Sequence, residues 1–110
     1  MPFDCLPEGL VSDLVKLRIA LDGVRNGWRR GKVGGKDADT HCAIGWLLIA
    51  AEWDTAEATR LALKYVYPAL PEKRQDPHAR LESIWTYNDT GGKRRIVQLF
   101  DDAVRLAEEV

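Results

Sequence analysis

The chain has 110 residues, of which 45% are hydrophobic and 30% are charged. This length and composition are typical of one globular domain with its own hydrophobic core. The 16 basic and 17 acidic residues nearly cancel, which argues against a large basic face for general nucleic-acid binding and against a strongly acidic nucleic-acid mimic. Any electrostatic function must therefore come from local clusters of charge.

Two cysteines, Cys5 and Cys42, are too few for a disulfide framework. The N-terminus has no basic start followed by an apolar run, so the sequence predicts no signal peptide. The longest apolar run, Ala43 to Ala51, is far shorter than the roughly 20 residues that a membrane span needs. We therefore expect a cytoplasmic protein with free thiols and no membrane contact.

The first predicted helix begins at Pro7-Glu8 and ends at Asn26-Gly27. Proline suits a first helical turn, where its missing N–H would be unpaired anyway, and Asn and Gly tolerate the left-handed conformation at a helix end. Between them apolar residues recur at steps of three and four, which indicates an amphipathic helix with a broad apolar face. These residues are Leu10, Leu14, Leu17, Leu21 and Val24, flanked by Val11, Val15 and Ile19.

The segment from Trp28 to Asp39 contains three glycines and has no helical period. It is either a loop or a short β-hairpin over 28–39 that turns at Gly34-Gly35. Its glycines would let backbone N–H groups approach an anion closely, although their spacing matches no phosphate-binding motif. A solvated loop is the alternative. The candidate residues for binding an anion or a partner are Trp28, Arg29, Arg30, Lys32 and Lys36.

The segment from His41 to Trp53 is apolar nearly all the way round a helix, which predicts a buried central helix over about 40–53. Asp39 or Thr40 would cap its start. Gly45 lowers helix propensity and indicates the close approach of another helix or an aromatic ring. Trp46, Trp53 and Trp85 lie on apolar faces and are assigned to the core.

Three further helices are predicted. Asp54 and Glu57 have the spacing of a capping box, at the start of a helix that Pro68 should end. Asp76-Pro77 should start a short helix, and the last helix should span about 92–109. The predicted fold is therefore all-α, a compact single domain over residues 1–110 with five helices, of which the central one is buried.

The last helix is charged against its dipole. Lys93, Arg94 and Arg95 lie in its first turn, and Glu108 and Glu109 lie in its last. A helix dipole prefers the opposite arrangement at both ends. Basic side chains beside unpaired N–H groups would favour an anion such as phosphate. The alternative is that Asp89 pairs with them or that they are solvated.

His41 and Cys42 open the central helix, where the dipole could favour a thiolate. Adjacent helical residues point in different directions, so His78 would have to act as the base of a Cys-dependent enzyme. A small buried cysteine in the core is the simpler interpretation. Cys5, His41, Cys42 and His78 lack the usual spacing of metal ligands, so we predict no metal site and no cofactor.

Three short segments carry a resemblance: Gly27-Trp28 after the first helix, the His-Cys-Ala-x-Gly-x-Leu motif at 41–47, and Asn88-Asp89 before the helix that contains 96–103. In these the chain resembles a family of small bacterial and phage-associated helical proteins of uncharacterised function. The resemblance implies a shared fold and no established activity.

Asn88 and Asp89 have a structural interpretation. Asn88 can end the short helix in a left-handed conformation, and Asp89 or Thr90 can cap the last helix. We also predict a hydrogen bond from His41 to the 88–90 turn or to a nearby backbone group.

The leading functional prediction is a non-enzymatic module that binds a protein partner, and that would inhibit a host system if the chain comes from a phage or mobile element. Its small size, balanced charge and lack of a convergent catalytic set favour this prediction. Binding of a nucleic acid or nucleotide through the basic residues is the first alternative. A Cys/His-dependent enzyme is the second.

Overall fold

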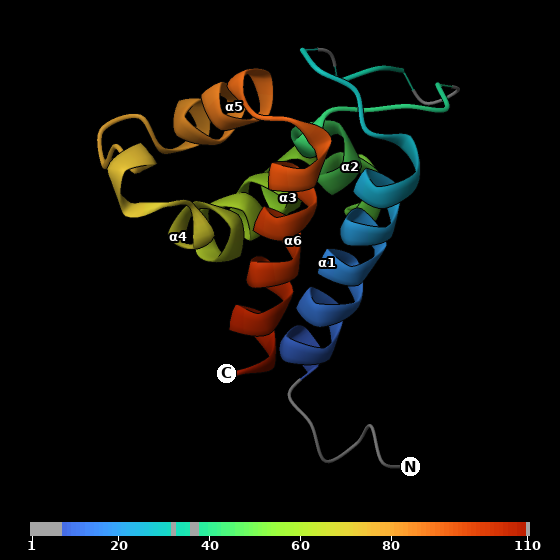
Figure 1. The fold of residues 1–110 in the computed structure, drawn as a ribbon. Coiled ribbons are helices and arrows are strands. Elements are labelled where there is room, and N and C mark those ends of the chain that lie inside the picture. Colours follow the sequence, from blue (N-terminus) through green and yellow to red (C-terminus); the bar gives the residue numbers. More distant parts are fainter. Residues whose placement is uncertain (1–7, 32, 36–37, 110) are drawn as a thin grey trace.

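The computed structural model describes residues 8–31, 33–35 and 38–109, and their side chains from Asp13 onward. Within these residues the chain is an all-α globule of five helices without a strand (Figure 1). Part of the third helix is a π-helical stretch, labelled η2. The elements are α1 (Glu8–Gly27), α2 (Ala43–Ala50), a continuous helix formed by α3 (Thr55–Leu61), η2 (Ala62–Val66) and α4 (Tyr67–Ala69), a 3-10 turn η3 (Glu72–Arg74), α5 (Arg80–Thr90) and α6 (Lys93–Glu108).

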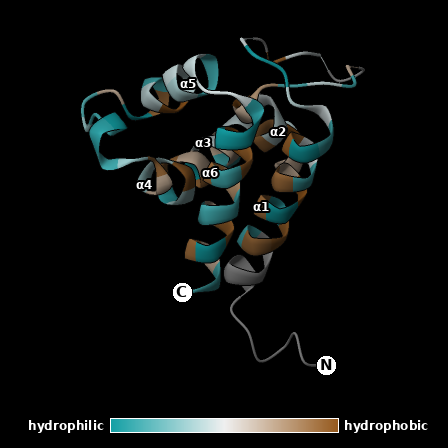
Figure 2. Ribbon diagram, viewed as in Figure 1, coloured by the Kyte–Doolittle hydropathy of each residue, from teal (hydrophilic) through white to brown (hydrophobic). Residues whose placement is uncertain are grey.

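The two longest helices, α1 and α6, pack against each other and run in opposite directions (Figure 1). Along both of them hydrophobic residues alternate with hydrophilic ones, as expected for helices with one buried face (Figure 2). The predicted apolar stripes therefore form the centre of the core. Buried members are Leu17, Leu21 and Val24 from α1 and Ile96, Leu99, Phe100 and Ala103 from α6.

The central helix α2 is shorter than the predicted span of 40–53. It ends at Ala50, and Glu52 and Trp53 take left-handed φ angles of 55° and 65° in the turn that follows. The predicted caps Asp39 and Thr40 are wrong, because the residue that precedes the helix is Cys42 and its side chain forms no capping bond. The N–H of Ala43 instead donates to Oδ1 of Asn88, at 3.0 Å. The capping acceptor thus comes from α5.

The helix that starts after Asp54 confirms the predicted cap, since Oδ1 of Asp54 accepts from the N–H of Glu57 at 3.1 Å. Pro68 does not end this helix as predicted, because the helix continues to Ala69. A proline ring clashes with the carbonyl four residues earlier in a regular α-helix. Here that carbonyl belongs to Lys64, which lies in the π-helical stretch η2. Because a π turn is wider than an α turn, it leaves room for the proline ring.

Of the two alternatives predicted for residues 28–39, the loop is confirmed in the described part and the hairpin is wrong. The described part of this segment forms only an isolated parallel bridge, in which the N–H of Arg29 donates to the carbonyl of His41 and the N–H of His41 donates to that of Gly27. The segment leaves the end of α1 and returns to the start of α2, so that Trp28 and His41 lie side by side. Its glycines therefore lie in a loop that crosses the start of α2, which we call the crossing loop.

Helix α5 begins at Arg80, later than Asp76-Pro77 predicted. The backbone N–H of Asp76 donates to Oγ of Ser83, and its Oδ1 accepts from the N–H of His78. These bonds stabilise a turn ahead of the helix. The side chain of Asp76 consequently caps this turn and does not cap α5.

The assignment of Trp85 to the core is wrong, and two residues that flank the apolar stripe of α1 are exposed as well. The side chain of Trp85 is 48% exposed, and Val15 and Ile19 are 48% and 46% exposed. Trp46 and Trp53 are half-buried. No element covers Trp85 or the outer edge of α1 in the described chain, so these apolar side chains face solvent.

Candidate functional sites

Asn88 is the polar centre of the fold. Its side chain is 3% exposed, and Oδ1 accepts from Nε1 of Trp28 at 2.7 Å and from the N–H of Ala43 at 3.0 Å. Asn88 is helical, so the prediction that it ends α5 in a left-handed conformation is wrong. One amide oxygen therefore joins the loop after α1, the start of α2 and the end of α5.

His41 is held by the loop that precedes it. The ring is 1% exposed, with Nδ1 2.6 Å from the carbonyl oxygen of Val33 and Nε2 3.0 Å from that of Ala38. It also packs edge-on against Trp46. The predicted bond to a nearby backbone group is thus confirmed, whereas the 88–90 turn contacts Ala43 instead.

Gly45 was expected to allow a close approach, and it does. A Cβ on Gly45 would lie 2.5 Å from the carbonyl oxygen of Val33 and 2.8 Å from Cβ of His41. The neighbour is the backbone of the crossing loop, where a helix or an aromatic ring was predicted. The spacing of His41 and Gly45 is therefore explained by this loop crossing the first turn of α2.

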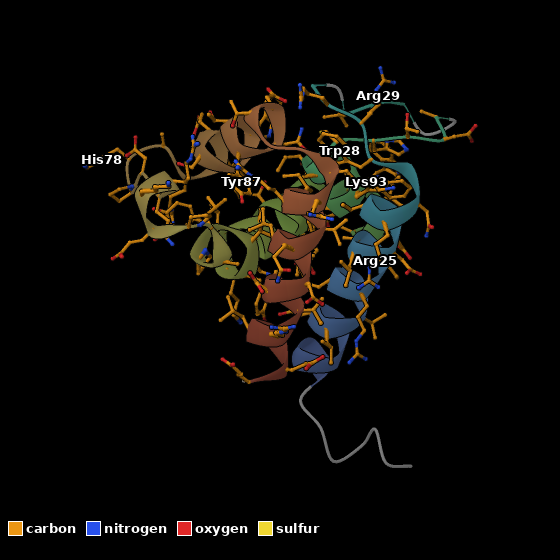
Figure 3. All side chains as sticks on the ribbon, viewed as in Figure 1. Arg25, Trp28, Arg29, His78, Tyr87 and Lys93 are labelled. Atoms are coloured by element: carbon orange, nitrogen blue, oxygen red, sulfur yellow. The ribbon has the colours of Figure 1, made fainter. Side chains whose placement is uncertain are left out.

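The residues proposed for an enzyme do not converge. Cys42 is buried as a free thiol, and both ring nitrogens of His41 face backbone carbonyls. His78 is exposed, on the far side of the molecule from Trp28 (Figure 3). In the described residues no three His, Cys, Asp or Glu side chains gather as a metal site would require.

The basic loop and the start of α6 lie together. Nη2 of Arg30 donates to the carbonyl oxygen of Gly91 at 2.9 Å, which fixes the described part of the loop beside the turn that precedes Lys93. Lys32 and Lys36 fall outside the described residues. We call the six exposed cations from these segments and from the last turn of α1 the basic end: Arg25, Arg29, Arg30, Lys93, Arg94 and Arg95.

The start of α6 is open. Gly92 precedes the helix without a capping side chain, and no acidic residue occupies the first turn. The predicted caps are wrong, because Oγ1 of Thr90 donates to the carbonyl of Thr86 and Oδ1 of Asp89 accepts from Nδ2 of Asn88. Both side chains belong to the end of α5.

The sequence-based prediction missed an ionic cluster around the buried Asp13, between α1 and the helix formed by α3 and η2. Asp13 is 3% exposed and accepts hydrogen bonds from Arg60 and from the Tyr65 hydroxyl, the latter at 2.6 Å. Glu57 bonds Arg60 as well, and Nζ of Lys16 reaches Glu57 at 2.8 Å. One signal was present, because Asp13 interrupts the apolar stripe of α1 at a step of four before Leu17.

The cluster shifts several pKa values. Burial by itself would raise the pKa of Asp13, but hydrogen bonds from Arg60 and Tyr65 outweigh it and hold that pKa below its ordinary value. Hydrogen bonds from Arg60 and Lys16 lower the pKa of Glu57. Burial and the bond to Asp13 raise the pKa of Tyr65 to about 12. The cluster is therefore an ionised clamp between two helices.

Helix α5 presents an apolar side chain beside a hollow. Trp85 and Leu81 are one helical turn apart and, with Glu82, line a hollow of about 240 Å³. A second hollow of about 260 Å³, lined by Leu63, Pro77, His78 and Arg80, adjoins it through Leu81 and Glu82. The sequence-based prediction placed Trp85 in the core and therefore missed this surface.

The chain matches no protein-family model, no curated protein and no solved structure. The resemblance to phage-associated helical proteins thus stays a prediction. Across the described residues, no helix has both the length and the apolar character to cross a membrane.

Proposed function

We propose that this protein is a non-enzymatic module that binds another protein, and that α5 carries the contact surface. The observation behind the proposal is the 48% exposure of Trp85. Tryptophan is one of three residue types, with tyrosine and arginine, that are enriched among the residues that dominate protein–protein binding energy. In the described chain it is the tryptophan that no neighbouring element covers.

The surroundings of Trp85 support a docking surface. Leu81 extends the apolar area along one face of α5, and the adjoining hollows give the surface relief into which partner side chains can insert. Arg80 and Glu82 lie at the edge of the same surface. An apolar centre with a charged rim is the usual composition of a protein interface.

The arrangement of the reactive side chains favours binding over catalysis. Cys42 and His41 lie in the packed interior, and each contributes to the scaffold. A nucleophile must reach both its base and its substrate. A specific form of this proposal is that the module is carried by a phage and inhibits a host system. The identity of the partner would test it.

The experiment compares cross-linked partners of matched variants. Tagged wild type, Trp85→Ala and Ile19→Ala would be cross-linked in lysate of the source cells, and captured proteins identified by mass spectrometry. Ile19 is a matched control, because it is 46% exposed and lies on α1. Truncating an interface tryptophan typically costs about 2 kcal/mol or more.

We expect one protein to be recovered with wild type and Ile19→Ala and to be lost with Trp85→Ala. Equal recovery with all three chains, or loss with Ile19→Ala alone, would overturn the assignment to α5. Repeated recovery of no protein would count against a protein partner altogether.

A further inference from the structure

The described cations of this protein differ in whether they pair with carboxylates. Lys16, Arg18, Arg60 and Arg105 form ion pairs with carboxylates. Among the described residues, no carboxylate lies within 4.0 Å of the cationic groups at the basic end. Within this part of the chain the charges of the basic end are therefore available to a ligand, as are the single charges of Lys64, Lys73, Arg74 and Arg80 elsewhere.

These cations come from three segments that the fold holds together. Arg25 belongs to the last turn of α1, Arg29 and Arg30 to the loop, and residues 93–95 to the first turn of α6. The bond from Arg30 to Gly91 and the bond from Trp28 to Asn88 fix the loop against the end of α5. Figure 3 shows Arg29 and Lys93 at the end of the molecule where α1 finishes and α6 begins.

We propose that the basic end binds the phosphate backbone of a nucleic acid, independently of the partner surface on α5. Five of its six cations are arginines, and the planar guanidinium matches phosphate with two parallel hydrogen bonds. A Cβ placed on Gly92 would meet nothing within 4 Å. A phosphate can consequently reach the three cations of the first turn of α6 from solvent.

The charge distribution explains how a nearly neutral protein can bind a phosphate backbone. Helix α6 carries three of its four cations in its first turn, whereas Asp101, Asp102 and Glu108 lie toward its other end, where Arg105 pairs with Asp101. Three exposed acidic residues, Asp22, Asp39 and Asp89, flank the basic end, which limits the footprint to a few phosphates. We therefore expect modest affinity with strong salt dependence and no preference for sequence.

A nucleic acid fits this surface better than an acidic protein does. Regularly spaced phosphates can engage arginines on several segments at once, whereas carboxylates on a protein sit on separate flexible side chains. The basic end also lacks an exposed aromatic residue that would anchor a protein, because the Trp28 ring is half-buried and its N–H is bonded to Asn88. A poly-glutamate competitor tests this choice.

The test measures fluorescence anisotropy of labelled duplex DNA, single-stranded DNA and RNA between about 50 and 200 mM salt. The variant Arg29→Gln/Arg94→Gln/Arg95→Gln removes three charges from the basic end and spares the structural Arg30. Its control, Arg18→Gln/Arg74→Gln/Arg105→Gln, removes three exposed arginines elsewhere. Circular dichroism would confirm that both variants fold.

We expect wild type to bind at least one of the three probes, with a slope of log affinity against log salt of about −3 to −5. The variant at the basic end should lose roughly 30-fold in affinity and two to three units of slope, and the control about 3-fold or less. Trp85→Ala should bind as wild type does, which separates this proposal from the one for α5. Absence of binding at low salt, equal losses in both triple variants, or stronger binding to poly-glutamate would each overturn it.

Discussion

The side chains of Trp28 and Asn88, 60 positions apart in the chain, are joined by a 2.7 Å hydrogen bond from the indole Nε1 to the amide Oδ1. The same oxygen accepts from the N–H of Ala43, which has no capping side chain of its own. Three segments thus depend on one buried acceptor. A donor left unpaired in such a place costs more than the bond itself contributes.

Replacing Asn88 with Ala should lower the free energy of unfolding by about 2–4 kcal/mol, because the buried N–H of Ala43 and the part-buried indole N–H of Trp28 lose their acceptor together. Urea denaturation followed by circular dichroism measures the change. Thr86→Ala is the matched control, since Thr86 is an exposed residue of the same helix and should change stability by about 0.5 kcal/mol or less. An Asn88→Ala protein as stable as the control would show that water replaces the lost oxygen.

Gly45→Ala should destabilise the protein even though alanine favours a helix by about 1 kcal/mol. The added Cβ would lie 2.5 Å from a backbone oxygen of Val33, and backbone cannot rotate away as a side chain can. We expect a net loss of about 1–3 kcal/mol in thermal or urea unfolding. Gly35→Ala is the control, because nothing lies within 4 Å of a Cβ there. A stabilised Gly45→Ala protein would contradict the packing of the loop over α2.

The parts of this fold that the sequence predicts are those set by neighbours within a few residues. The bounds of α1, the stripe of α6 and the Asp54 cap all depend on spacings of three or four. The same local rules failed at the start of α2, where the acceptor that replaces Asp39 or Thr40 lies 45 positions away on Asn88. No spacing in the sequence indicates which distant side chain will arrive there.

The candidate surfaces show the same limit. Clusters of like charge are visible in the sequence, but the bond from Arg30 to Gly91 that joins them is not. Trp85 lies on an apolar face, and whether such a face is buried depends on which element packs over it. In this fold none of the described elements does.

Acid should weaken the clamp between α1 and α3. The pKa of Asp13 is lower in the folded protein than its ordinary value of 3.8, so its contribution to stability is present above that pH and is lost as the pH falls below it. Urea titrations from neutral pH to about pH 3 should therefore show a steeper loss for wild type than for Asp13→Asn. Glu109→Gln, at an exposed position, should follow wild type. Parallel curves for wild type and Asp13→Asn would contradict the lowered pKa.

Alkali should act on the same clamp through Tyr65. Its pKa is raised from 10.0 to about 12, so its contribution is present below pH 10 and is lost as the pH rises toward 12. Tyr65→Phe should cost about 1–2 kcal/mol at neutral pH, because Asp13 loses a buried donor, and it should show a shallower decline between pH 10 and 12. Tyr67→Phe, a half-buried neighbour, should keep the decline of wild type. Absorbance of tyrosinate against pH would locate the titration directly.

The thiol of Cys42 should be unreactive in the folded protein, because it lies buried at the start of α2. Cys5 falls outside the described residues, so the test uses a Cys5→Ser chain in which Cys42 is the remaining cysteine. Reaction with a disulfide reagent should be roughly 100-fold slower than in denaturant, which corresponds to an opening free energy of about 3 kcal/mol. Denaturant below the unfolding transition should accelerate it, since local opening exposes the sulfur. A native rate equal to that of a small thiol would place Cys42 in reach of substrates and favour the enzyme alternative over a scaffold role.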